Sequence, residues 1–299
     1  IKDLNRLDEK RQEVRAKVEG IIDGNPPYSH AELKRENMLH VANVNFREAE
    51  SYMAMAQSSY YDLLTEAPTL ATIRPKNAKP LYVTPWGNSI SEHFDTMLKD
   101  SDMWDSTCQL SQRGTVGIGY GVLFWCDNVE VIPEAAEYGA VLIDDRAKSD
   151  VSKWCSIGIK YPMSAGELNR KIIDEGAAKD TGWNLAAVRN SIMKAGDGKN
   201  LPNEWEYFQN QLRNNETGFS SNLKVINTCF FFYKEDDGTI TQCVVDLDNP
   251  EDYLMRRESY YKSWKNCVAA MYYDKGKGTH HSVKGLGIKM CNIMELKNR

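Results

Sequence analysis

The sequence predicts an α+β protein, in which helices and groups of strands follow one another in blocks instead of alternating as βαβ units. Long segments with apolar residues at helical spacing are the first observation behind this prediction. Short apolar runs between turn residues are the second, and a clear hairpin at Asp236–Gly238 is the third. The order along the chain is helices, sheet, helices, sheet and helix, without internal repeats or low-complexity tracts.

The N-terminal part is predicted to be helical. A first helix covers about residues 4–22 and ends at the turn-forming residues 23–28. Ser29 and Glu32 then form a capping box, in which the serine oxygen accepts a backbone N–H and the glutamate reaches back. A second helix, of roughly 37 residues and about 55 Å at 1.5 Å per residue, is expected to run up to Pro68.

Apolar residues recur along this second helix at alternating spacings of three and four, with alanine at every second position. Small residues there let a neighbouring helix pack closely, either from the same subunit or from the next one. The alternative is an amphipathic helix that packs on its own core. The residues predicted to make this packing seam are Leu39, Ala42, Phe46, Ala49, Met53, Ala56, Tyr60 and Leu63.

The middle of the chain changes from helix to strand. Residues 69–85 are an extended, proline-containing connector, and a second capping box at Ser89 and Glu92 is expected to open a helix to about Gln112. The glycine-rich run Gly114–Asp127 follows. The predicted elements after it are strands at 129–133, 140–144 and 153–161, helices after the capping box of Ser164 and Glu167 and at 183–194 and 202–212, and strands at 223–233, 239–247 and 267–273.

The glycine-rich run invites comparison with a phosphate-binding loop. A dinucleotide fingerprint needs a strand, then G-x-G-x-x-G, then a helix, whereas in Gly114–Asp127 the glycines precede the apolar strand. We therefore favour a helix end followed by a strand, with glycines that permit bulges or close backbone approach. A phosphate cradle is the alternative.

The amino-acid composition limits the classes of protein to which this chain can belong. Hydrophobic residues make up 41% and charged residues 26% of the 299 residues, which is ordinary for a globular protein. No apolar run is long enough for a membrane span. The net charge of −5 argues against tight phosphate binding but not against loose contact with nucleic acid. The seven cysteines contain no C-x-x-C pair, so they are interpreted as buried thiols in a reducing compartment.

Few residues are candidates for chemistry. His280 and His281, with Asp246 and Asp248, could be imagined as a metal site, but neighbours on an extended segment point apart, which favours a pair of loop histidines. The pair Asp144–Asp145 could bind a divalent ion or act in acid–base chemistry, but acids that end a strand are more often solvated turn residues. No nucleophile, P-loop or zinc motif is present, so we predict no catalytic residue, metal or cofactor.

One loop is locally basic. Four lysines alternate there with glycines and two histidines, and they could touch a phosphate backbone; a solvated loop is the alternative. These lysines are Lys275, Lys277, Lys284 and Lys289.

Several segments, read together, resemble the portal, or head-to-tail connector, proteins of tailed bacteriophages, in particular the podovirus-like versions. Each motif is weak alone, and their shared order over almost the whole chain makes the resemblance. The segments are Gly24–Tyr28, Asn43–Glu50, Tyr60–Leu64, Gly117–Gly121, Phe124–Trp125, Asp144–Asp145, Trp183–Asn184, Gln211–Asn215, Asp237–Thr241, His280–Gly287 and Asn298–Arg299.

The resemblance implies a homo-oligomeric ring of twelve subunits at one capsid vertex in the virion, assembled in the cytoplasm of a bacterial host. Double-stranded DNA passes through such a ring during packaging and ejection. The implied partners are the large terminase subunit, the major capsid protein and the head–tail adaptor and tail proteins, with no membrane. The basic-loop lysines are then the expected channel-facing residues, and the seam residues the expected subunit contacts.

The resemblance also implies a division of the chain into parts of a portal wing. These parts are a helical part at 1–112, a first antiparallel sheet at 113–162, a helical insertion at 163–215, a second sheet at 216–287, and the start of a stem or channel helix at 288–299. The chain lacks an initiator Met and ends in a helix-like run, so we expect that both ends continue in a longer protein.

Two other functions stay open at this point. One is a different virion protein, such as a head or tail adaptor. The other is a soluble enzyme with its site at residues 117–121 or at Asp144–Asp145.

The charge of the chain suits the portal hypothesis. A conduit must let DNA slide, and strong neutralisation of the phosphates would hold the duplex, so a negatively charged chain with few lysines near the bore is what such a conduit needs.

Overall fold

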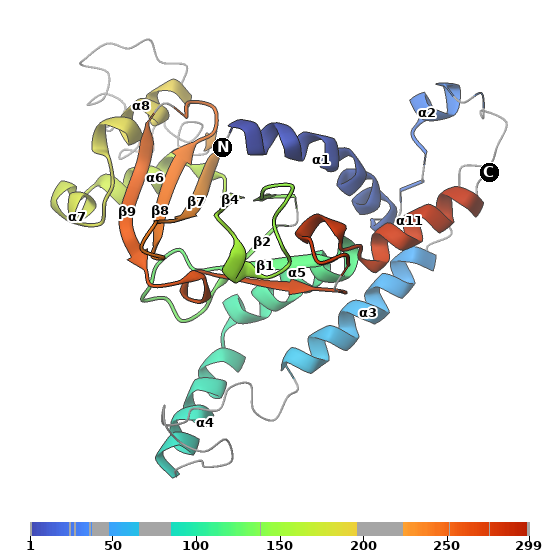
Figure 1. Cartoon of the computed structure of the whole chain (residues 1–299), viewed down its shortest axis with the longest axis horizontal. Coiled ribbons are helices and arrows are strands. Elements are labelled where there is room, and N and C mark those ends of the chain that lie inside the picture. The colour runs from blue at the N-terminus through green and yellow to red at the C-terminus, as the bar shows by residue number, and fades with distance from the viewer. Residues whose placement is uncertain are drawn as a thin grey trace, which may run out of the picture. The chain divides into compact units, whose positions relative to one another are not determined.

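The computed structural model describes residues 2–23, 25–26, 28–35, 37, 48–65, 85–137, 139–195, 224–250, 252–274 and 276–297 (Figure 1). It contains helices and antiparallel sheets, which confirms the α+β class. The chain divides into two compact units, each made of two stretches. The first unit is Ile1–Asp8 with Ala140–Asn266, and the second is Glu9–Gly139 with Cys267–Arg299.

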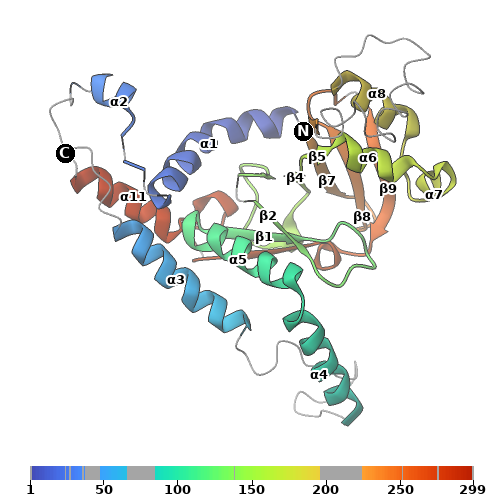
Figure 2. The ribbon, with the colours of Figure 1, turned by 180° about the vertical axis from the view of Figure 1, so that it is seen from behind.

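A five-stranded antiparallel sheet is the centre of the first unit. Its strand order is β3-β4-β7-β8-β9, and β7 and β8 are joined by the predicted hairpin, in which Gly238 has a φ of +90°. Figures 1 and 2 show α6 and α8 on one side of this sheet. The strands are β3 (Val141–Leu142), β4 (Ser156–Lys160), β7 (Thr228–Lys234), β8 (Ile240–Asp246) and β9 (Tyr253–Tyr261).

The core of this unit lies along the central strands of the sheet. Ile157, Ile159 and Phe232 are completely buried, and every residue of β8 is buried, so side chains on both faces of this strand are covered. The remaining elements are β5 (Met163–Ser164) paired with β6 (Val225–Ile226), the helices α6 (Ala165–Ile172), α7 (Glu175–Asp180) and α8 (Leu185–Ala195), and the 3₁₀ turns η1 (Val151–Lys153) and η2 (Trp264–Asn266).

A three-stranded antiparallel sheet with the order β10-β1-β2 belongs to the second unit. Helix α5 packs on β1, and α3 packs on α5 and on the C-terminal helix α11. The elements are α1 (Lys2–Ile22, which begins in the first unit), α2 (His30–Arg35), α3 (Glu48–Thr65), α4 (Pro85–Lys99), α5 (Asp102–Gly117), β1 (Tyr120–Phe124), β2 (Glu134–Ala136), β10 (Val268–Tyr272), η3 (His280–Ser282) and α11 (Leu286–Lys297).

Two of the three predicted capping boxes are confirmed. The Ser29 N–H donates to Glu32 Oε2 over 2.7 Å and the Glu32 N–H donates to Ser29 Oγ over 3.2 Å, and Ser164 and Glu167 make the same reciprocal pair. The box predicted at Ser89 is wrong, since α4 begins four residues earlier, at Pro85. Proline is favoured in the first turn, where its missing N–H costs nothing.

The predicted 37-residue helix is also wrong. Helix α2 ends at Arg35, and Asn37 has a φ of +55°, in the left-handed region where asparagine is one of the few tolerated residues. The strand predicted at 129–133 is a turn that leads into β2. Strand β9 was not predicted at all. The helix predicted at 202–212 lies outside the described residues.

The predicted sheet membership is wrong as well. Strands at 113–162 were expected to form one sheet and those at 216–287 a second one. Instead β1 pairs with β10 in the second unit, while β4 pairs with β7 in the first. Each sheet therefore joins strands from both predicted parts, because strand pairing depends on tertiary context and not on neighbourhood in the sequence.

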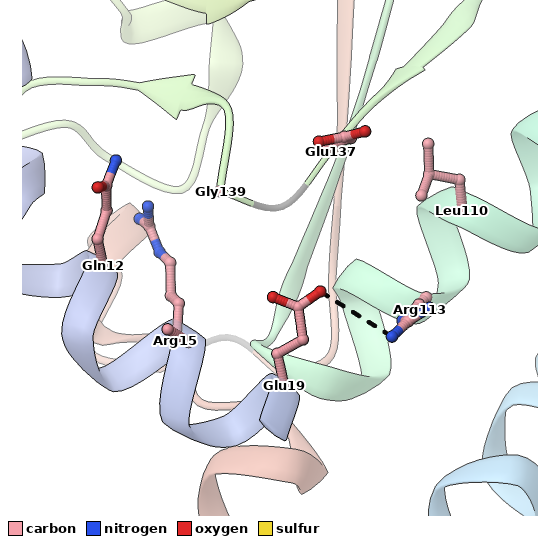
Figure 3. A pocket seen from close by; sticks show the side chains of 8 residues that line it. Gln12, Arg15, Glu19, Leu110, Arg113, Glu137 and Gly139 are labelled. Carbon is pink, nitrogen blue, oxygen red and sulfur yellow. Dashed lines mark ion pairs between the residues drawn. The ribbon is translucent and has the colours of Figure 1, made fainter. Parts of the chain in front are cut away.

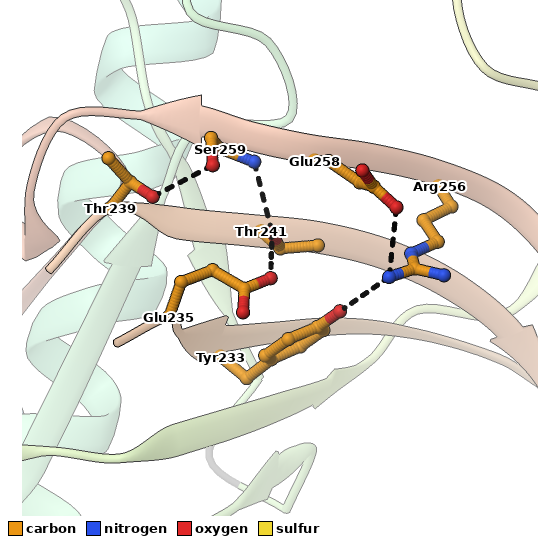
Figure 4. Close-up of polar contacts among 7 residues, drawn as sticks. All are labelled: Tyr233, Glu235, Thr239, Thr241, Arg256, Glu258 and Ser259. Carbon is orange, nitrogen blue, oxygen red and sulfur yellow. Dashed lines mark hydrogen bonds and ion pairs between the residues drawn. The ribbon is translucent and has the colours of Figure 1, made fainter. Parts of the chain in front are cut away.

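Strand β9 carries a bulge that is held by side chains (Figure 4). Ser259 has a φ of +48°, and its N–H donates to the Oγ1 of Thr241 over 3.0 Å. The Thr241 hydroxyl in turn donates to Glu235 over 2.7 Å, and Thr239 donates to the Ser259 hydroxyl over 2.9 Å. Beside them Arg256 joins Tyr233 and Glu258. The hydrogen bonds of Thr241 and Thr239 to Ser259 fix a conformation that a non-glycine residue adopts only at a cost.

We expect Ser259→Val to lower the free energy of unfolding by about 2 kcal/mol, because a β-branched side chain is strained at positive φ and lacks the hydroxyl that Thr239 contacts. Urea denaturation followed by circular dichroism measures this loss. The control is Glu258→Val on the exposed neighbouring position, for which a change within about 0.5 kcal/mol is expected. Equal effects of the two substitutions would show that the bulge geometry does not matter.

Candidate functional site

The glycine-rich run lies where two backbone segments of the second unit meet. Gly119 has a φ of +122°, and its carbonyl accepts the Tyr273 N–H over 2.9 Å, while the Gly285 N–H donates to the Ile118 carbonyl over 2.7 Å. A Cβ atom on Gly285 would lie 2.5 Å from the Val116 carbonyl oxygen and 2.6 Å from the Gly119 nitrogen. The prediction that these glycines serve close backbone approach is therefore confirmed.

His280 lies next to this junction and is completely buried. Its Nδ1 is 3.0 Å from the Tyr272 hydroxyl, and its ring centroid is 4.3 Å from that of Tyr120, whose hydroxyl accepts a 2.7 Å hydrogen bond from Arg15. Burial, reinforced by His281 and Arg15, lowers the pKa of His280 to about 3. His280 therefore lies in the segment between β10 and α11, in the short turn η3, and is a neutral core residue there.

The other acidic and histidine candidates serve the backbone. Asp144 accepts the Arg146 N–H over 2.7 Å, and the buried Asp246 accepts the Asp248 N–H over 2.9 Å, so both carboxylates close turns. Within the described part of the chain, no three His, Cys, Asp or Glu side chains are placed to hold a metal ion. The two histidine rings meet edge to face with centroids 4.9 Å apart.

The cysteines are free, and five of the seven are buried. Burial raises the pKa of both Cys108 and Cys243 to about 11, which keeps their thiols protonated and unreactive. The prediction of buried thiols is wrong for Cys155, which is exposed, and for Cys126, which is only half-buried.

The basic-loop lysines have different surroundings. Lys277 and Lys284 are exposed. The Nζ of Lys289 lies 3.4 Å from an Asp274 carboxylate oxygen and 5.1 Å from the centre of the Tyr273 ring, so its charge is partly matched within the subunit. Lys275 lies outside the described residues. Their predicted place in a channel stays a prediction.

The predicted packing seam is divided by the structure. Met53 is 1% exposed and faces the subunit's own core, Ala56 is half-buried, and Tyr60 and Leu63 are exposed. Leu39, Ala42 and Phe46 lie outside the described residues, as does the side chain of Ala49. The helix thus uses one side for its own core, which was the alternative interpretation, and another side is open.

The open side of α3 carries apolar residues, of which the sequence analysis singled out only Leu63, as part of the seam. Tyr52, Met55 and Leu63 are 55%, 66% and 71% exposed. They follow a spacing that places them on one face of the helix, and we call them the outer stripe. Tyr52 and Met55 were missed because the heptad pattern through Met53 and Ala56 is centred on a different face, which the stripe shares only at Leu63.

The opposite side of α3 borders a groove of about 660 Å³, which it forms with α5. At one end the Tyr61 hydroxyl donates to Asp105, whose other oxygen accepts a 2.8 Å hydrogen bond from Gln109. Gln112 is only 4% exposed, and its Nε2 has no hydrogen-bond partner among the described residues. The lining residues are Ala54, Gln57, Ser58, Tyr61, Ser106, Gln109, Leu110, Gln112 and Arg113.

A smaller cavity of about 380 Å³ lies between α1, α5 and the end of β2 (Figure 3). Arg15 and Gln12 come from α1, and the Arg113 guanidinium is 4.0 Å from Glu19 and 2.8 Å from Asp23. Its two arginines and two glutamates, Glu19 and Glu137, balance in charge.

None of these features is a recognisable catalytic centre. No described helix has the length and apolar character needed to cross a membrane. A comparison of the chain with models of known protein families and a comparison with curated protein sequences found no match.

Proposed function

We propose that this chain is a structural subunit of a phage portal ring at one capsid vertex, which forms the conduit for packaging and ejection of double-stranded DNA. The observation that carries the proposal is the shared order of the portal-like motifs, from Gly24–Tyr28 to His280–Gly287. The partners under this proposal are further copies of the chain, the large terminase subunit, the major capsid protein and the head–tail adaptor and tail proteins.

The outer stripe of α3 supports the ring-forming part of the proposal. Three large apolar side chains that are more than half exposed on one helix face are best covered by another protein surface. A subunit that presents such a face, together with a different complementary face, joins its copies head to tail, and such contacts form a ring when the rotation from one copy to the next closes. Twelve subunits is the number that the resemblance implies.

The chemistry of the chain fits a conduit. A net charge of −5 limits electrostatic grip on phosphates, and the exposed Lys277 and Lys284 supply only a small local positive charge. Under this proposal, DNA that moves through the ring binds only weakly to its surface. ATP is hydrolysed by the packaging motor and not by this chain.

The test is the assembly state of the purified chain. We expect light scattering coupled to size-exclusion chromatography to give a mass of about twelve chains, and negative-stain images to show rings with a central hole that admits a DNA duplex. A compact monomer at all accessible concentrations, or a closed particle without a hole, would contradict the proposal.

A further inference from the structure

We infer that the two opposite sides of α3 are the two halves of one head-to-tail interface: the outer stripe of one copy inserts into the α3–α5 groove of the next. This inference rests on the proposed ring and names the surfaces that build it. Both surfaces belong to the second unit, and both lie within α3 and its direct neighbour α5.

The directions of the two surfaces are those that a ring requires. At 100° per residue, the stripe positions 52, 55 and 63 point about 160° away from the groove positions 54, 57, 58 and 61. In a ring of many subunits the two joining faces of each subunit also point in nearly opposite directions. A two-fold dimer would instead use one face twice.

The shapes of the two surfaces match as a ridge and a groove. The stripe is a convex row of large apolar side chains, and the groove is concave and lies between two helices, so the stripe helix fits as a third helix packed ridge into groove. Ala54 and Leu110 are the apolar residues of its lining, and the Tyr61–Asp105 hydrogen bond joins its two walls.

The polar groups of the two surfaces also match. The Arg113 guanidinium borders the groove, and its side chain is 39% exposed, so a partner can reach it. On the stripe side, the exposed Asp62 follows Met55 by seven residues and precedes Leu63, so a carboxylate accompanies the apolar row. A neighbour's Asp62 brings a further carboxylate to the groove beside Arg113, whose guanidinium also contacts Asp23 and Glu19 within the subunit.

A mixing experiment tests this arrangement, because a head-to-tail interface can be blocked on either side separately. Leu63→Arg blocks only the stripe and Ala54→Arg blocks only the groove, and both positions are exposed, so the fold is retained. Each variant alone is expected to be monomeric in light scattering. An equal mixture is expected to form a particle of two chains that cannot grow, since one intact stripe meets one intact groove.

Ile173→Arg is the control, because it places the same charge on an apolar residue that is also more than half exposed but belongs to the first unit and to neither surface, and it is expected to form rings like the wild type. Rings formed by either blocked variant, or a mixture that stays monomeric, overturn the inference while the wild-type ring stands. A wild-type chain that forms no ring overturns the proposed function and this inference together. Unchanged circular dichroism confirms that all variants are folded.

Discussion

Replacing Gly285 by alanine is expected to lower the free energy of unfolding by about 4 kcal/mol or more, an effect at the upper end for a single methyl group. The added Cβ would lie 2.5 to 2.6 Å from three backbone atoms, the carbonyl oxygens of Val116 and Gly117 and the nitrogen of Gly119. Backbone atoms cannot rotate away as a side chain can. The short Gly285–Ile118 hydrogen bond would be lost with the displacement.

Gly139→Ala is the matched control for this substitution. No atom lies within 4 Å of a Cβ built on Gly139, and its φ is not positive, so a change within about 0.5 kcal/mol, or a small gain, is expected. Urea denaturation midpoints and slopes of both variants measure the difference. Similar midpoints for the two variants would show that the junction can open by several tenths of an ångström at little cost.

The same junction illustrates what the sequence could predict. The glycines at 117, 119 and 121 indicated close backbone approach, since their spacing did not fit a phosphate loop. Local signals were reliable in the same way at Ser164 with Glu167 and at the Gly238 hairpin, because the contacts that form these structures lie within a few residues.

The partner of the glycines could not be predicted. Gly285 lies far from residues 116–119 in the sequence, and the residues around it do not indicate that these will be its neighbours in the fold. Strand β9 was missed for a related reason: its bulge at Ser259 breaks the alternation, and Arg256, Arg257 and Glu258 stand in its middle because one face of this edge strand is open.

The exposed surface of α3 is a third feature that could not be predicted from the sequence. The heptad pattern correctly marked a side of α3 that packs, but Met53 packs within the subunit. Which side of a helix is left open depends on the positions of α5 and α11, so Tyr52 and Met55 could be recognised only from the fold. A pattern of apolar residues predicts burial but not the partner that causes it.

His280 is expected to make the stability of the protein depend on pH below neutrality. The unfolded chain takes up a proton on this side chain near its ordinary pKa of 6.5, whereas burial keeps the pKa of the folded state near 3. Below pH 6.5 the unfolded state therefore binds more protons, so stability falls as the pH falls. At 1.36 kcal/mol per unit, this contribution amounts to about 2 kcal/mol lost by pH 5, and it vanishes above pH 6.5.

His280→Phe separates this effect from other titrating groups. The phenyl ring keeps an aromatic contact with Tyr120 but loses the contact with the Tyr272 hydroxyl, so the variant is expected to be less stable at neutral pH. Because the phenyl ring cannot be protonated, the loss of stability between pH 6.5 and 5 is expected to be about 2 kcal/mol smaller than in the wild type. His93→Gln, on an exposed position of α4, is expected to keep the wild-type decline. Parallel profiles of stability against pH for the wild type and His280→Phe would mean that His280 is protonated in the folded protein. Water would then have to reach the ring between Tyr120, Tyr272 and Arg15.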